Sequence, residues 1–421
     1  MTTHSIATLP ATTAIHPWKD RNSVTLFLAQ LFAQVCDKLL ALGMVWIITT
    51  KGGEEYTPWF LLAGGLPYVL LIQHIPKVIE YFGPLKTTYL CDFVRGILFM
   101  VVASIIYFLK LEDSMGRDLI FLLMGLNFLS SVGGAYFNAA IYTLPTRVAA
   151  PEYVQQLSAM VNGCFSIANV LGPLLAALLF AKLGIVGLIY LAGLSFIFAG
   201  ILELFITMRP LEVNPKKDEE EEKASFKARP FAIFKNNLTI RYMLLTFLGL
   251  NFFLVPILLF FPLYAKNFFG GNLDAFVVLE TAMGIGMISG SFLLSLFAPP
   301  GKFWQKLLLS LGCIGVFYII FVVSKILWLS AVSVLFIGLS VQFANIIIIN
   351  FFQKEVRPDE VSSVMTLANF ITISSVPLSM LVVGSVVQLL PLSGIALACA
   401  VIMLLHAPLS LAIPRIREIK I

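Results

Sequence analysis

Twelve long apolar stretches divide this sequence, and no other feature restricts its fold as strongly. They cover 24–48, 59–79, 89–109, 119–143, 154–181, 185–208, 242–268, 276–297, 304–323, 327–352, 361–390 and 393–413. Each reaches the roughly 20 residues that a helix needs to cross a bilayer core. A backbone in lipid must satisfy its own hydrogen bonds, so such segments form helices. The sequence therefore predicts an all-α membrane protein with twelve transmembrane helices.

The composition excludes most soluble and enzymatic alternatives. Hydrophobic residues make up 59% of the chain and charged residues only 12%, so lipid must solvate most of the surface. The five cysteines are scattered through apolar segments and match neither a disulfide framework nor a zinc site. Paired-histidine metal motifs, a GxSxG elbow and a phosphate-binding GxxxxGK[ST] loop are missing from the sequence. We expect no enzyme activity, no cofactor and no metal site.

The distribution of positive charge predicts the orientation. With both termini in the cytoplasm, about 21 of the 28 Lys and Arg residues fall on inner loops or helix ends. The net charge of +5 then reflects cytoplasmic loops, and we expect no nucleic-acid partner. We predict a protein of a bacterial cytoplasmic (inner) membrane that is surrounded by lipid bilayer and acts as a monomer.

A charged linker and an internal repeat predict two halves. The stretch PKKDEEEEKASFKARP lies within the polar region between segments six and seven. An offset of 207 residues superposes Asn138 on Asn345, Arg147 on Lys354 and Asn162 on Asn369, among others. The repeat places a substrate between the halves, although chance similarity of two apolar helix pairs is the alternative. The predicted regions are a tail at 1–21, six-helix bundles at 22–208 and 239–413, a linker at 209–238 and a tail at 414–421.

The first apolar segment contains the most informative polar residues. Gln30, Gln34 and Asp37 recur at i, i+4 and i+7 and share one helix face. A charge near the centre of a membrane helix costs about 2.5–3.5 kcal/mol, so this face is expected to line a transport pathway in which Asp37 exchanges protons. The alternative is a structural ion pair with Lys38 or with another helix. Lys38 could bind an anionic substrate group, hold Asp37 ionised, or pair elsewhere.

Two stretches resemble a known transporter family. The loop EYFGPLKTTYLCDFVRG carries Glu80, Lys86, Asp92 and Arg95, and resembles the loop motif of the major facilitator superfamily. Its Asp92-Phe-Val-Arg95 part resembles the start of the third helix in the drug:proton antiporter-3 family of macrolide efflux pumps and enterobactin exporters. Segment five spaces its small residues as the antiporter motif of that superfamily does, at Ala159, Ala168, Gly172, Pro173, Ala176 and Ala177.

The resemblance implies the major facilitator fold of two six-helix bundles, alternating access and export driven by proton entry. Glu80, Lys86, Asp92 and Arg95 would hold the inner gate. Glu280 is a second acidic candidate, as a proton site, a partner of Lys38 or a side chain that reaches the interface. Five amides lie on helices that border the cavity in this superfamily, where they would contact substrate or join helices: Asn138, Asn162, Gln342, Asn345 and Asn369.

We therefore expect a secondary transporter that exports an amphipathic small molecule, either a drug-like compound or a siderophore, by proton antiport. An alternative is a transporter or flippase for lysophospholipid or another lipid-like substrate, without strict proton coupling, because AQLFAQVCD also resembles the first helix of lysophospholipid transporters. A membrane receptor or scaffold that transports nothing is a further alternative.

Overall fold

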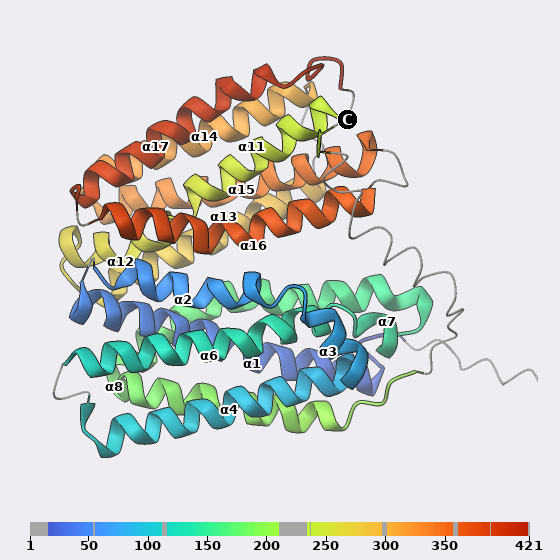
Figure 1. The fold of residues 1–421 in the computed structure, drawn as a ribbon, viewed down its shortest axis with the longest axis vertical. Helices are drawn as coiled ribbons and strands as arrows, with labels where there is room; N and C mark the ends of the chain where they lie inside the picture. Colours follow the sequence, from blue (N-terminus) through green and yellow to red (C-terminus); the bar gives the residue numbers. More distant parts are fainter. Residues whose placement is uncertain are drawn as a thin grey trace, which may run out of the picture.

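The computed structural model describes residues 16–53, 55–111, 116–209, 234–235, 237–296, 301–356, 361–387 and 389–419. The predicted linker lies almost entirely outside these residues. The described residues form helices and their connections, without strands, which confirms the predicted all-α class. Two groups of helices stack along the long axis of the molecule (Figure 1).

The first group contains α1 (Arg21–Ile47), the π-helix η1 (Ile48–Gly52), α2 (Thr57–Leu70), α3 (Ile75–Phe82), α4 (Pro84–Phe108), α6 (Arg117–Ile141), α7 (Pro145–Val148), the 3₁₀ turn η2 (Pro151–Tyr153) and α8 (Val154–Leu204). The second contains α11 (Leu238–Leu254), α12 (Ile257–Phe268), α13 (Leu273–Leu296), α14 (Phe303–Val323), α15 (Leu327–Glu355), α16 (Val361–Val386), α17 (Leu392–Leu409) and η3 (Ser410–Ala412).

Ten described helices are long and apolar enough to cross a membrane, or eleven if the bent pair α2 and α3 forms one span. The 51-residue α8 enters this count once, but it breaks at Gly184, where φ is 62° and ψ is −172°. At 1.5 Å per residue it is far too long for a single crossing. Counting its two arms separately gives the twelve predicted crossings.

The second apolar segment is not the single straight helix that we expected at 59–79. It divides into α2 and α3, which meet at an angle of 65°. Pro76 lies in the first turn of α3. A proline disfavours helical geometry in the residue before it and cannot donate a backbone hydrogen bond to the preceding turn, so the helix ends at Leu70 and restarts at Ile75.

The two groups of helices meet mainly through α2 against α16 and α8 against α13. At the end of the molecule that contains η1, here called the η1 end, the Lys266 ammonium donates to the carbonyl of Thr49 at 2.8 Å. The Trp46 ring stacks on Phe276 nearby, with 6.2 Å between ring centroids. These contacts join the two halves at the η1 end.

The halves also touch near the middle of the spans. A Cβ on Gly65 of α2 would lie 3.1 Å from Val376 of α16, and one on Gly284 of α13 would lie 3.0 Å from the carbonyl of Asn169 of α8. The 207-residue offset relates Asn169 to Val376. Each half therefore contributes the same position of the predicted repeat to one of these contacts.

Toward the beginning of α8 and of α16, polar side chains on these two helix faces are exposed. Ser166 and Asn162 lie one and two turns before Asn169 on the same face of α8, and both are exposed. Thr372 and Asn369 have the same relation to Val376 on α16 and are exposed too. We call these four side chains the interdomain opening. These side chains lie in the part of α8 and α16 nearer the opposite end of the molecule, which holds α3 and α7 and is called the α3 end (Figure 1).

Candidate functional site

Asp37 lies midway along α1 and pairs with a residue of another helix. The Arg95 guanidinium, on α4, donates through Nη2 to Asp37 Oδ1 at 2.7 Å. The Asp37 side chain keeps 38% of its surface exposed, whereas that of Arg95 keeps 6%. The carboxylate is therefore ion-paired but still partly exposed, and of the two pairings considered as the alternative role, the one with another helix forms.

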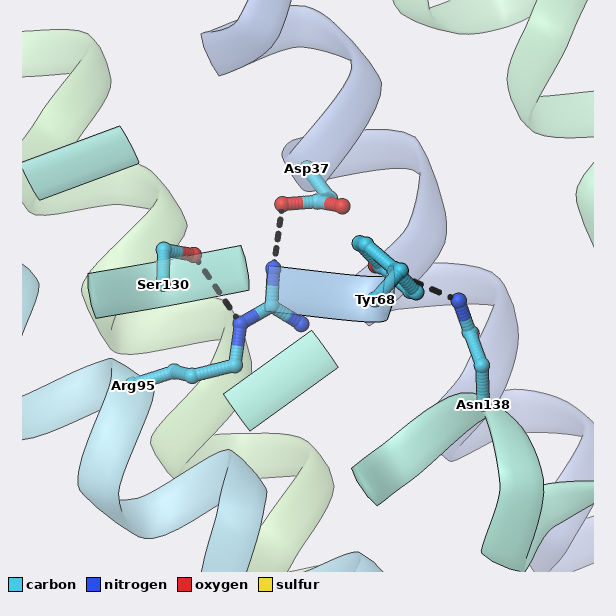
Figure 2. A network of polar contacts seen from close by, with 5 residues as sticks. All are labelled: Asp37, Tyr68, Arg95, Ser130 and Asn138. Carbon is cyan, nitrogen blue, oxygen red and sulfur yellow. Dashed lines mark hydrogen bonds and ion pairs between the residues drawn. The ribbon is translucent and has the colours of Figure 1, made fainter. Parts of the chain in front are cut away.

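Several groups hold Arg95 in this position (Figure 2). Its Nε donates to Ser130 Oγ of α6 at 3.1 Å. Its guanidinium carbon lies 4.0 Å from the centre of the Phe196 ring on α8, a cation–π geometry that contributes about 0.5–2 kcal/mol. A Cβ on Gly133 would lie 2.8 Å from Arg95 Cγ, so the glycine leaves room for the arginine stem.

A second polar pair, on α2 and α6, lies beside the ion pair (Figure 2). The Tyr68 hydroxyl accepts a hydrogen bond from Asn138 Nδ2 at 3.3 Å, and Tyr68 interacts electrostatically with both Arg95 and Asp37. A Cβ on Gly134 would lie 2.6 Å from the Tyr68 oxygen. Figure 2 shows the resulting arrangement, in which α1, α2, α4 and α6 each supply a polar group.

Lys38 takes a different direction from its neighbour Asp37. Its side chain is exposed, and it interacts electrostatically with Glu280 of α13, in the other half of the molecule. Its backbone packs tightly on α8, because a Cβ on Gly172 would lie 2.6 Å from Lys38 Cβ. The small residues of segment five therefore serve close helix approach here, as their spacing predicts. No ion pair joins the described Lys38 and Glu280 side chains in this conformation, and the roles expected for both stay predictions.

Gln30 does not line the interdomain opening, contrary to expectation. It is fully buried, and its Nε2 donates to Glu203 Oε1 of α8 at 2.8 Å. Gln34 is also buried. The i, i+4, i+7 rule puts both on the face of Asp37, but only Asp37 reaches solvent, since α8 covers the other end of that face.

The remaining predicted residues lie apart from the ion pair. Asn162 and Asn369 are exposed in the interdomain opening. Gln342 and Asn345 are half-buried on α15, where Gln342 packs against Gly290 of α13. Glu80 and Lys86 are exposed at the α3 end. Asp92, expected beside them at the gate, is instead fully buried.

Several residues of the site were not identified from the sequence as functional, namely Tyr68, Ser130, Gly133, Gly134 and Glu203. A charge close to the end of an apolar segment usually reaches the interface, so Glu203 gave no signal. The adjacent Gly133 and Gly134 in the fourth segment were the one local sign that side chains of other helices approach the backbone closely there. No group of three or more metal-ligating side chains occurs among the residues that the structure describes.

Comparison with known proteins concerns the family and the fold of the chain. The family model of the Major Facilitator Superfamily matches residues 26–380. Macrolide efflux protein A of Streptococcus pyogenes is 21% identical over 368 residues, which cover 85% of this chain and 87% of that protein. A protein of the same name from Enterococcus faecalis is 22% identical and covers 76% of this chain and 97% of its own.

A solved structure has the same fold. The bacterial homologue of the human lysosomal transporter Spinster, in its inward-facing and unoccupied conformation, superposes with a TM-score of 0.71 over 95% of this chain and 98% of its own. The sequences are 13% identical, so this likeness concerns the fold alone.

Proposed function

This chain belongs to the major facilitator superfamily of transporters, and from that premise we propose that it exports an amphipathic small molecule in exchange for protons. The observation that carries the proposal is the Asp37–Arg95 pair, a half-exposed carboxylate in the middle of an apolar span. A water-accessible acid at that depth can take up and release protons, which is the use that membrane proteins make of such residues.

The surfaces of the interdomain opening support an amphipathic substrate. Asn162, Ser166, Asn369 and Thr372 offer amide and hydroxyl groups, and the exposed Phe370, next to Asn369 in the chain, adds an apolar ring. The named relatives are macrolide efflux proteins, so drug-like compounds are the first substrates to test. Siderophores share this mixed polarity.

The proposed cycle starts from the conformation described here. The positive-charge distribution supports a cytoplasmic location of the α3 end in the bacterial inner membrane that we propose, so in this cycle the opening faces inward and the contacts at the η1 end close the outer side. Substrate enters while Asp37 is ionised and paired with Arg95. After the halves rock to the outward state, a proton from outside neutralises Asp37. Substrate then leaves, and the protonated carrier returns.

Asp37→Asn tests the coupling. The protein is reconstituted into liposomes with an acidic lumen, and uptake of a radiolabelled macrolide is followed. Wild-type transporters whose α3 end faces the medium should move the macrolide into the lumen, where it accumulates. Uptake by liposomes that contain the variant should fall to the level of protein-free liposomes. Macrolide-induced thermal stabilisation should persist in the variant, because the amide keeps the shape of the carboxyl group.

The exposed Asp118→Asn variant is the matched control and should transport as the wild type does. Normal gradient-driven uptake by Asp37→Asn would refute the coupling role. A siderophore and a fluorescent lysophospholipid are tested in parallel. Lysolipid movement that continues without a pH gradient would support the lipid-transport alternative, and an absence of flux or stabilisation with all three would favour a receptor or scaffold.

A further inference from the structure

Two more carboxyl groups lie behind the Asp37–Arg95 pair, inside the first group of helices. Asp92 lies one turn before Arg95 on α4, and Glu203 lies near the end of α8. Both side chains are fully buried. The helices that carry them pack closely, since a Cβ on Gly200 would lie 3.3 Å from the Phe93 ring. The charge of Asp92 acts on Glu203 across this helix contact.

These two acids have very few hydrogen-bond donors. Glu203 Oε1 accepts from Gln30 Nε2, but Glu203 Oε2 and both oxygens of Asp92 have no hydrogen-bond partner. Arg95 is the cation that acts on Asp92. In this conformation, however, its Nη2 and Nε donate to Asp37 and Ser130.

The titratable and charged groups that face the two acids come from four helices. On α1 this group is Asp37, and on α4 the groups are Cys91 and Arg95. Tyr68 on α2 interacts with Arg95. Asp92 on α4 and Glu203 on α8 also face each other. If all three carboxyls were ionised, one guanidinium would face three negative charges. Two like charges in a site without water do not both ionise, and a buried charge without a partner is unstable.

We propose that Asp92 and Glu203 form a second proton-binding site that holds one proton, and that Arg95 switches between this site and Asp37. The proton resides on Asp92, which lacks any donor, while Glu203 keeps its charge with the help of Gln30. The second site stands on its own geometry, and its use in transport rests on the function proposed above.

The switch follows from spacing on α4. Residues at i and i+3 are neighbours on a helix surface, so Arg95 can reach Asp92 by a side-chain rotation. When a proton neutralises Asp37, Arg95 loses that ion pair and turns to Asp92. Asp92 then gives its proton to Glu203 and pairs with Arg95 as a carboxylate. One proton has entered at Asp37 and one has moved from Asp92 to Glu203, so the step balances.

Infrared spectroscopy of the purified full chain tests the site without any substrate. The protein is placed in a detergent that lacks ester groups, and the deuterium-sensitive carbonyl stretch of protonated carboxyl groups is recorded at neutral pH. Subtracting the spectrum of each variant from that of the wild type isolates the residue concerned. Asp92→Asn should remove a band, because the remaining acid, Glu203, is ionised. Glu203→Gln should retain the band, because Asp92 still lacks a donor.

The double variant Asp37→Asn/Glu203→Gln tests the switch. Arg95, released from residue 37, should pair with Asp92 and ionise it, so the band that Glu203→Gln keeps should disappear. Asp118→Asn is the control and should leave every band in place. If Asp92→Asn does not fold, the comparison of Glu203→Gln with this double variant tests the proposal by itself.

A wild-type spectrum that contains no band sensitive to Asp92→Asn would overturn the proposal, and so would a band that the double variant retains. These outcomes are separate from those of the transport assay. The expected bands together with normal export by Asp37→Asn would refute only the coupling role of Asp37. Missing bands together with lost export would refute only the second proton site.

Discussion

At Arg95, three kinds of contact meet on one side chain: an ion pair with Asp37, a hydrogen bond to Ser130 and the face of the Phe196 ring. A guanidinium suits this position because its planar group can donate in several directions and stack on a ring at once. Lysine offers a compact point charge instead. The chemistry of the site therefore depends on this residue as much as on Asp37.

We predict that Arg95→Met lowers stability more than Asp37→Asn does. The first change leaves Asp37, Asp92 and Glu203 without a cation, whereas the second leaves a cation that can still pair with Asp92. Because Asp37 is partly exposed, the Asp37–Arg95 pair should contribute only about 1 kcal/mol. Denaturant unfolding of both single variants and the double variant measures this coupling energy. Effects that add within about 0.5 kcal/mol would show that the pair contributes nothing.

Among the elements, α8 shows how one residue divides an apolar stretch into two crossings. The φ and ψ of Gly184 fall in a region that is essentially restricted to glycine. Elsewhere, glycines serve close packing: Cβ atoms on Gly286 and Gly338 would lie 2.1 Å and 2.4 Å from carbonyl oxygens of Leu335 and Met283, between α13 and α15. Gly184 is therefore needed for its backbone conformation, whereas Gly286 and Gly338 are needed for the short distance between α13 and α15.

We predict that Gly184→Ala lowers the free energy of unfolding by about 1–3 kcal/mol, the usual cost of such a strained backbone. Gly163→Ala is the matched control. It lies in the helical part of the same α8, and its Cβ would meet nothing within 4 Å, so it should be neutral or raise stability by up to about 1 kcal/mol. Denaturant unfolding in detergent measures both. Equal effects would mean that the break at Gly184 does not need a glycine.

At the scale of the whole molecule, the two halves touch at the η1 end and in the middle, and polar side chains of the facing helices are exposed toward the α3 end. In the transport cycle proposed above, this asymmetry reverses. Lys266, which donates to the carbonyls of Thr49 and Thr50 at 2.8 and 3.4 Å, must release them when the η1 end opens. Its ammonium group lies where the last carbonyls of a helix carry partial negative charge, which favours the closed state seen here.

We predict that cysteines placed in the interdomain opening react with a membrane-impermeant maleimide. Ser166→Cys and Asn369→Cys should be labelled several times faster than Asn169→Cys, which lies at the contact with Gly284. Each new cysteine is introduced into a protein whose five native cysteines are replaced by serine. Labelling should occur in inside-out vesicles and not in intact cells, because the α3 end is proposed to face the cytoplasm. Labelling in intact cells but not in inside-out vesicles would show that the α3 end faces the outside.

The sequence by itself determined the class and the number of crossings, because each apolar segment in lipid must satisfy its own backbone. That requirement is local, so length and composition suffice. It also singled out Asp37, since a charge inside an apolar run is visible without any neighbour, whereas Asp92 and Arg95 were identified through the resemblance of their loop and assigned to the inner gate. The resemblance of short motifs to the major facilitator superfamily was confirmed by the family match over 26–380.

Only the tertiary structure decided which charges meet. Arg95 reaches Asp37 across 58 positions of the chain, and Gln30 reaches Glu203 across 173. Such contacts depend on which helix faces pack together, and that is set by the fit of small residues such as Gly133 and Gly172 against neighbouring side chains. Periodicity placed Gln30 and Asp37 on one face, but the packing of α8 buried the first and left the second open to water.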